Sequence, residues 1–143
     1  MILLDTDHFS VLADARHSQH AQLVDRLESA DDAVLIPVVS VAEQLRAWLA
    51  QVNRIRDVKK QVYPYDRLIR LLETLGQWEI ARWSEPAAQE FERLRRARIR
   101  IGTQDLKIAS IAITNDAVLL SANLRDFERV PGLRVEDWLR DDR

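Results

Sequence analysis

The chain has 143 residues, enough for one domain with a hydrophobic core, and we expect residues 1–143 to form a single domain. Hydrophobic residues make up 47% and charged residues 31%, a globular composition, and no apolar run is long enough to cross a bilayer. The absence of cysteine excludes disulfides, thiol nucleophiles and cysteine-ligated zinc, and a net charge of −2 gives no overall attraction to nucleic acid. Because no signal-peptide pattern follows Met1, we expect a cytoplasmic protein.

The first half of the chain alternates short apolar segments with segments of helical periodicity. Strands are predicted at residues 2–4 and 34–37, and helices from about residue 8, from about residue 18, from Ser40 and over residues 54–76. Such alternation of strands with helices is typical of a parallel sheet.

The second half repeats this alternation and contains the most informative stretch, residues 101–127. A third strand is expected within residues 78–83, followed by a helix from Ser84. Gly102 permits a turn, Thr103 is expected to cap the next helix, and the apolar residues that follow surround that helix almost completely, which predicts burial. Residues 118–120 then predict a buried strand. We therefore expect an α/β fold, with a central parallel sheet covered by helices on both faces.

In open parallel sheets, ligands bind beyond the carboxyl ends of the strands. Ser121, Asn123 and Asp126 follow the last predicted strand and are therefore placed where chemistry would take place. Four acidic residues from separate segments are expected to meet at this edge: Asp5, Glu43, Asp105 and Asp126. Neighbouring carboxylates repel one another unless a cation lies between them, and oxygen-only ligands favour Mg²⁺ or Mn²⁺.

Each acidic residue also has a purely structural interpretation. Ser40 and Glu43 have the spacing of a capping box, and Asp105 would interact favourably with the helix dipole. Asp5 and Asp7 could cap the first helix. The three histidines are interpreted as core or surface residues rather than metal ligands. The joint placement of the acids favours the metal site.

Positive charge is concentrated just before the central stretch, although the chain as a whole is slightly acidic. Arg95, Arg96 and Arg98 lie within a short arginine-rich segment, and nearly all basic residues of the chain are Arg. The segment fits either a solvated helix face or a ridge that contacts phosphate groups of RNA, for which Arg is a good bidentate ligand.

Several motifs together resemble the PIN-domain ribonucleases of toxin–antitoxin pairs, commonly called VapC. The matching segments, in chain order, are Ile-Leu-Leu-Asp-Thr-Asp from residue 2, Ser-Val-Ala-Glu-Gln-Leu from residue 40, Ile-Gly-Thr-Gln-Asp from residue 101 with Ile108 and Ala109, Leu-Ser-Ala-Asn-Leu-Arg-Asp-Phe-Glu-Arg-Val-Pro-Gly-Leu from residue 120, and Val-Glu-Asp-Trp from residue 135. They span nearly the whole chain.

The resemblance implies a PIN-like fold and an acidic pocket for one or two Mg²⁺ or Mn²⁺ ions. It implies that Asp5, Glu43 and Asp105 are the three most regular acids of the family and that Asp126 is a fourth, more variable one. Ser121 matches a position that orients water or phosphate, and Asn123 is beside it. Two departures are Asp7 where Asn is commoner and Ser-Ala-Asn from residue 121 in place of Thr-Asn-Asn.

The activity implied by the resemblance is metal-dependent hydrolysis of phosphodiester bonds in single-stranded or looped parts of structured RNA. Asn123, Arg95, Arg96 and Arg98 are candidate RNA contacts. The resemblance also implies a homodimer and a VapB-like antitoxin whose tail lies across the acidic groove.

Two other classes of function remain open from the sequence. Asp5-Thr6-Asp7 after an apolar strand also fits the first motif of haloacid-dehalogenase-type phosphatases, although the later Gly-Asp-x-x-x-Asp of that class is absent. The other alternative is a non-catalytic module that uses the fold to bind RNA or protein, which the presence of all four acids disfavours.

Overall fold

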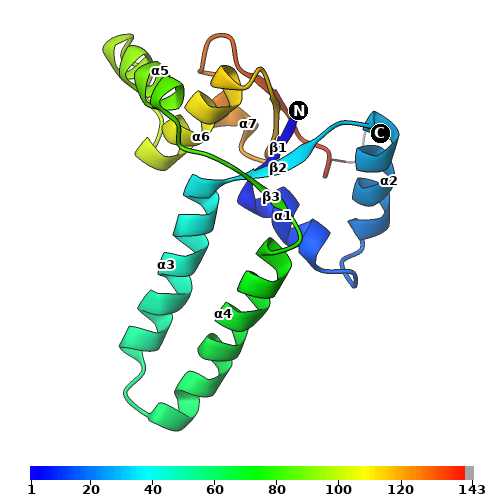
Figure 1. The fold of residues 1–143 in the computed structure, drawn as a ribbon, viewed down its shortest axis with the longest axis vertical. Helices are drawn as coiled ribbons and strands as arrows, with labels where there is room; N and C mark the ends of the chain where they lie inside the picture. The colour runs from blue at the N-terminus through cyan, green and yellow to red at the C-terminus, as the bar shows by residue number, and fades with distance from the viewer. Residues whose placement is uncertain (141–143) are drawn as a thin grey trace.

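A five-stranded parallel sheet runs through the middle of the molecule (Figure 1). The computed structural model describes residues 1–140, so the last three residues of the expected domain lie outside the described part. The sheet has the order β3-β2-β1-β4-β5, with strands β1 (Ile2–Leu4), β2 (Val34–Pro37), β3 (Glu79–Ala81), β4 (Val118–Leu120) and β5 (Arg134–Glu136). All neighbouring strands are parallel. The predicted α/β fold is confirmed.

Helices cover both faces of the sheet because successive side chains of each strand point to opposite faces. Leu3 and Leu119 belong to one core cluster, with residues of α5 (Glu85–Arg96) and α6 (Thr103–Thr114). Leu4 and Leu120 belong to a second cluster, with residues of α1 (Thr6–Ala13) and α2 (His20–Ala30). Strands that are apolar at every position are therefore buried on both sides.

Helix α6 is the most deeply buried helix, as its all-round apolar sequence predicts. Its buried residues are Leu106, Ile108, Ala109, Ser110, Ile111 and Ala112. The hydroxyl of Ser110 donates to the carbonyl of Leu106 at 2.7 Å, so the polar residue of this set is satisfied inside the helix. Packing on this helix fixes the position of its first turn, which carries Asp105.

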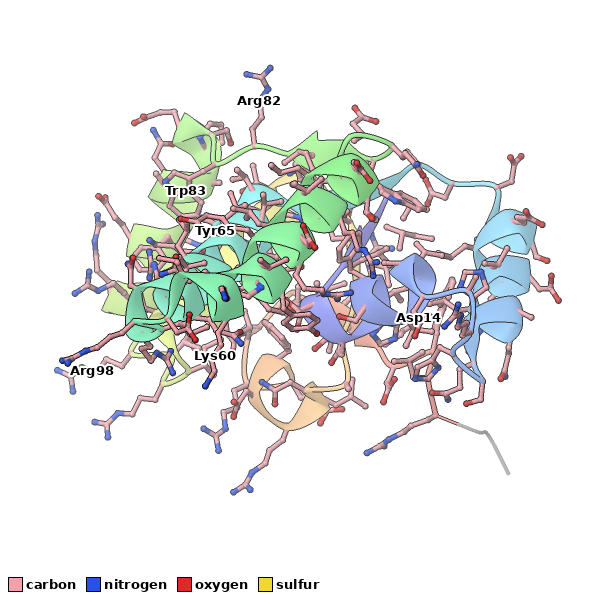
Figure 2. All side chains as sticks on the ribbon, turned by 90° about the horizontal axis from the view of Figure 1, so that it is seen from below. Asp14, Lys60, Tyr65, Arg82, Trp83 and Arg98 are labelled. Atoms are coloured by element: carbon pink, nitrogen blue, oxygen red, sulfur yellow. The ribbon has the colours of Figure 1, made fainter. Side chains whose placement is uncertain are left out.

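Helices α3 (Val38–Arg54) and α4 (Val62–Leu75) form an arm that projects from the sheet (Figure 1). A 3₁₀ turn, η1 (Val58–Gln61), closes its far end. Figure 2 looks from below at this end, where Lys60 and Tyr65 are labelled. Seven large apolar side chains of the arm are exposed: Leu49, Val58, Val62, Tyr63, Tyr65, Ile69 and Leu72. In the described part of the chain, no helix is both long and apolar enough to span a membrane.

Some element boundaries differ from those predicted. Helix α1 begins at Thr6 because the Asp5 side chain caps it, about two residues before the predicted start. Thr103 is the first residue of α6 rather than its cap, which is Gly102. The short helix α7 (Leu124–Phe127) and strand β5 were not predicted as elements. In β5, only the central Val135 is partly buried, which leaves little apolar pattern to detect.

Candidate metal-binding active site

Strands β1 and β4 lie side by side, and polar residues follow both at the same edge of the sheet. The backbone N–H of Asp5, directly after β1, donates to the carbonyl of Leu120 at 2.9 Å. The hydroxyl of Ser121, directly after β4, donates to Oδ2 of Asp5 at 2.8 Å. The structure thus joins two residues that the sequence placed at strand ends, 116 positions apart.

Asn123, in the loop after β4, links two further acids, Asp105 and Asp126. Its side-chain amide nitrogen donates to Oδ2 of Asp105 at 3.3 Å and to Oδ2 of Asp126 at 3.1 Å. Its backbone N–H donates to the hydroxyl oxygen of Ser121 at 3.0 Å. Residues 121–123 therefore touch three of the four predicted acids. Asn123, predicted as an RNA contact, here holds carboxylates.

Glu43 reaches the site from α3, whose start differs from the prediction. The helix begins at Val38 without a side-chain cap, so Ser40 is a buried residue of its first turn and Glu43 follows in the second turn. Within residues 1–140, the Ser40 hydroxyl has no hydrogen-bond partner. The capping-box interpretation of Ser40 and Glu43 is therefore wrong. Glu43 instead lies close enough to Asp105 to raise the pKa of Asp105.

The electrostatics of the site penalise ionised carboxylates. Burial raises the pKa of Asp5, with smaller contributions from Asp7 and Asp105, although hydrogen bonds from Thr6 and Ser121 oppose the shift. Burial, Glu43 and Asp126 likewise raise the pKa of Asp105, against the hydrogen bond from Asn123. A cation beside these groups would offset both burial and repulsion.

The donor set of this cluster fits a hard cation. All its candidate ligands are carboxylate or hydroxyl oxygens, the chemistry that Mg²⁺ and Mn²⁺ prefer. Among residues 1–140, no three acidic or histidine side chains converge closely enough to form a ready ligand cage. The acids face one another instead, and Ser121 and Asn123 hold three of them, Asp5, Asp105 and Asp126.

Asp7 takes part in the site in a way that the sequence did not reveal. Its Oδ2 accepts from the backbone N–H of Ala122 at 2.9 Å, and its Oδ1 lies 2.9 Å from Nδ1 of His8. Burial raises its pKa, but hydrogen bonds from His8 and Ala122 outweigh burial, and the net shift is downward. Asp5 is the N-cap of α1, and the Asp7 side chain also accepts from a backbone N–H of the first turn, that of His8, at 2.7 Å. The available signal was a second acidic residue, three positions after β1.

The arginine-rich segment lies at the end of α5 and in the loop that follows. Arg93 pairs with Glu90, and Arg96 lies 3.4 Å from Glu92, so these cations are partly neutralised within the helix. Arg95 covers the ring of Phe91 at 5.7 Å. Arg98 has a positive φ of 61°, and Figure 2 shows its side chain extending away from the body of the molecule.

Comparison with known proteins identifies relatives over most of the chain. The family model described as "PIN domain" matches residues 2–133. A protein named ribonuclease VapC from Rickettsia bellii is 33% identical over 107 residues, which cover 73% of this chain and 75% of that protein. A protein named tRNA(fMet)-specific endonuclease VapC from Salmonella typhimurium is 32% identical over 88 residues, or 59% of this chain and 67% of that one.

Solved structures share the fold over nearly the full length. A DNA-bound VapBC structure from Salmonella typhimurium has a TM-score of 0.74 at 23% identity, with 96% of this chain and 97% of that chain covered. VapBC2 from Rickettsia felis, bound to a promoter DNA fragment, has a TM-score of 0.68 at 24% identity, with coverage of 96% and 99%. At these identities the likeness shows the fold alone.

Proposed function

The chain belongs to the PIN-domain family and is an endoribonuclease of the VapC type, and from this premise we propose that Asp5, Glu43, Asp105 and Asp126 form its active site. The observation that carries this proposal is that the Ser121 hydroxyl and the Asn123 amide bring Asp5, Asp105 and Asp126 together at the sheet edge. Burial and neighbouring carboxylates raise the pKa of Asp5 and Asp105 there. Carboxylates with pKa values perturbed by burial and by neighbouring charges are typical of functional sites. Family membership rejects the phosphatase alternative.

The divalent cation that we propose is Mg²⁺ or Mn²⁺. Asp5 and Asp105 would be its direct ligands, Glu43 a ligand or a base that orients water, and Asp126 an outer ligand. When bound, such an ion lowers the pKa of water to give hydroxide and stabilises the charge that develops on phosphate.

The residues around the acids fix where their oxygens point. The Ser121 hydroxyl and the Thr6 N–H each hold one oxygen of Asp5, at 2.8 Å in both cases. The amide of Asn123 keeps Asp105 and Asp126 facing the same point. A carboxylate held in this way needs no rearrangement when substrate arrives, which is the advantage of a preorganised site. Glu43 takes part in none of these hydrogen bonds and faces Asp105, so we assign to it the transfer of a proton from water.

The substrate that we propose is structured RNA cut in single-stranded or looped segments, because an unpaired backbone can bend into an edge site. Arg95 and Arg98 are the better phosphate contacts of the arginine-rich segment, since Arg96 pairs with Glu92 and Asn123 is engaged by the acids. Cleavage should therefore weaken with rising salt.

The partners that we propose are a VapB-like antitoxin and a second copy of the chain. We also propose that residues 1–143 form a single domain. Several solved structures that share this fold are of VapBC proteins from bacteria. The exposed apolar side chains of the α3–α4 arm support an association surface, because monomeric proteins rarely leave such sets uncovered.

The test is cleavage of a mixed transfer and ribosomal RNA pool with Mg²⁺ or Mn²⁺, with and without chelator. We expect Asp5→Asn to keep the fold, since Asn also caps helices, and to lose at least about 10²-fold in rate. Asp25→Asn, on the exposed face of α2, is the matched control and should cut normally. Undiminished metal-dependent cleavage by folded Asp5→Asn would overturn the assignment, and no cleavage by metal-loaded wild type would favour a binding module.

A further inference from the structure

His8 is fully buried, and its two ring nitrogens have different partners. Nε2 lies 3.0 Å from the backbone nitrogen of Trp138, in the segment after β5, and 3.5 Å from Oδ1 of Asp137. Because a backbone N–H can only donate, Nε2 must accept and carries no proton. In neutral His8 the proton is then on Nδ1, which donates to Oδ1 of Asp7 at 2.9 Å. In neutral His8, the hydrogen bonds to the Trp138 N–H and to Asp7 therefore select the same tautomer.

Asp7 connects His8 to the loop that follows β4. Its Oδ1 is held by His8, through the ring and through the backbone N–H at 2.7 Å, and its Oδ2 accepts from the N–H of Ala122 at 2.9 Å. Ala122 lies between Ser121, which donates to Asp5, and Asn123, which holds two further acids. One hydrogen-bond chain thus connects the C-terminal segment with the loop that orients the carboxylates.

We propose that His8 and Asp7 are positioning residues for RNA cleavage. The relay consists of the Trp138 N–H, the His8 ring, the Asp7 carboxylate and the Ala122 N–H, and it fixes residues 121–123 against the acids. This inference rests on the proposed function, because it assigns the relay to the same site. Neither residue is assigned a contact with RNA or with the attacking water, so both act through the loop.

The relay explains why position 7 holds a carboxylate rather than an amide. A carboxylate accepts on both oxygens, and its neighbours, the N–H groups of His8 and Ala122, all donate. In Asp7→Asn, the amide NH₂ would face a donor whichever way it turned. Either Ala122 would lose its acceptor, or His8 would change tautomer and Trp138 would lose its acceptor.

Two substitutions of His8 separate the halves of the relay. Asn places its amide near Nδ1 and keeps a donor to Asp7, whereas Gln places its amide near Nε2 and keeps an acceptor for Trp138. Since only the link to Asp7 reaches the loop directly, we expect kcat to fall further in His8→Gln, roughly 10- to 100-fold, than in His8→Asn. KM should change little in both. His20→Gln is the control, because the His20 ring bonds only the Val11 carbonyl within the described chain.

NMR tests the relay without any assay of activity. In wild type at alkaline pH, the ¹⁵N spectrum should show His8 with Nδ1 protonated and Nε2 unprotonated. The amide resonance of Ala122 should move in His8→Gln and in Asp7→Asn, and it should stay in place in His20→Gln. Asp7→Asn is the second variant if buried His8 does not tolerate Gln.

The two sets of results separate this inference from the proposed function. Protonation of Nε2 in wild type, an unmoved Ala122 resonance in folded His8→Gln, or a kcat equal to that of wild type would each overturn the relay. If wild type cuts no RNA but shows the expected tautomer and Ala122 shifts, the relay stands as a structural connection while its assignment to catalysis falls with the proposed function.

Discussion

The edge of the sheet and the α3–α4 arm use the same kinds of apolar residue in opposite ways. At the edge, Leu4 and Leu120 are completely buried, one residue before Asp5 and Ser121. On α4, Ile69 and Leu72 are each 54% exposed. Apolar residues at the edge hold the polar groups that follow them, whereas those on the outer face of the arm contribute little to the fold.

This difference assigns separate tasks to the two regions. Burial around the edge makes charge expensive and hydrogen bonds strong, which suits catalysis. Exposed apolar side chains on two helices that pack mainly against each other suit association with another protein. Substitutions of the site residues should therefore change RNA cleavage, and substitutions on the arm should change binding to a partner. Buried residues near the site should also affect stability, whereas exposed residues of the arm should not.

The largest effect is expected at Asp105, where activity and stability should change in opposite directions. Asp105→Asn removes a carboxylate whose pKa is raised by burial, Glu43 and Asp126, so metal-free protein should unfold at an equal or higher temperature. RNA cleavage should fall at least about 10²-fold. Calorimetry in chelator and a cleavage assay measure the two quantities.

Asp66→Asn, on the arm, sharpens this result as a control. Asp66 is exposed on α4, so the unfolding temperature and the cleavage rate of the Asp66→Asn variant should both stay close to those of wild type. A lower unfolding temperature for Asp105→Asn would show that the acid supports the fold, which would contradict the contrast between the two regions.

The next effect compares the same substitution in the two regions. Leu119→Ala removes a fully buried side chain from β4 and should lower the free energy of unfolding by about 2–5 kcal/mol. Leu72→Ala, on the exposed face of α4, should cost less than about 0.5 kcal/mol. Urea titrations of both variants measure the difference, and similar costs would mean that the arm packs on the body in solution.

A smaller effect is the pH dependence of stability in metal-free protein. The pKa values of Asp5 and Asp105 are raised in the folded state, so their contribution is most favourable below the ordinary Asp pKa and is lost as pH rises through the raised values. Asp7 acts oppositely: its lowered pKa gives stability above the ordinary value, which is lost as pH falls. Denaturation in chelator at stepped pH should show a shallower loss with rising pH in Asp105→Asn.

Adding Mg²⁺ at neutral pH should reverse this loss in wild type, because a bound cation favours the ionised carboxylates. The same addition should stabilise Asp105→Asn less. Equal stabilisation of both proteins would indicate binding elsewhere on the molecule.

The sequence was sufficient where a local pattern determines the structure. Strands β1, β2 and β4 have the predicted bounds because each is a short apolar run that only an interior strand accommodates. The strand ends then placed Asp5 and Ser121 together, since parallel strands end at one edge. Local patterns could not show that Asp7 accepts a hydrogen bond from Ala122, 115 residues away, because that contact depends on the register and on the turn after β4.

Helix caps also show where a local pattern is not sufficient to predict structure. Substitution of two serines that were both predicted at helix starts gives the smallest expected effect. Ser84 and Ser40 both precede helical patterns, but only Ser84 is a cap: its hydroxyl accepts from the Ala87 N–H at 3.2 Å. Ser84→Ala should therefore lower the free energy of unfolding by about 1 kcal/mol. Ser40→Ala removes a buried hydroxyl that has no partner among the described residues, so it should be neutral or slightly stabilising. Thermal unfolding of both variants tests this, and a loss in Ser40→Ala equal to that in Ser84→Ala would mean that the Ser40 hydroxyl is bonded in solution.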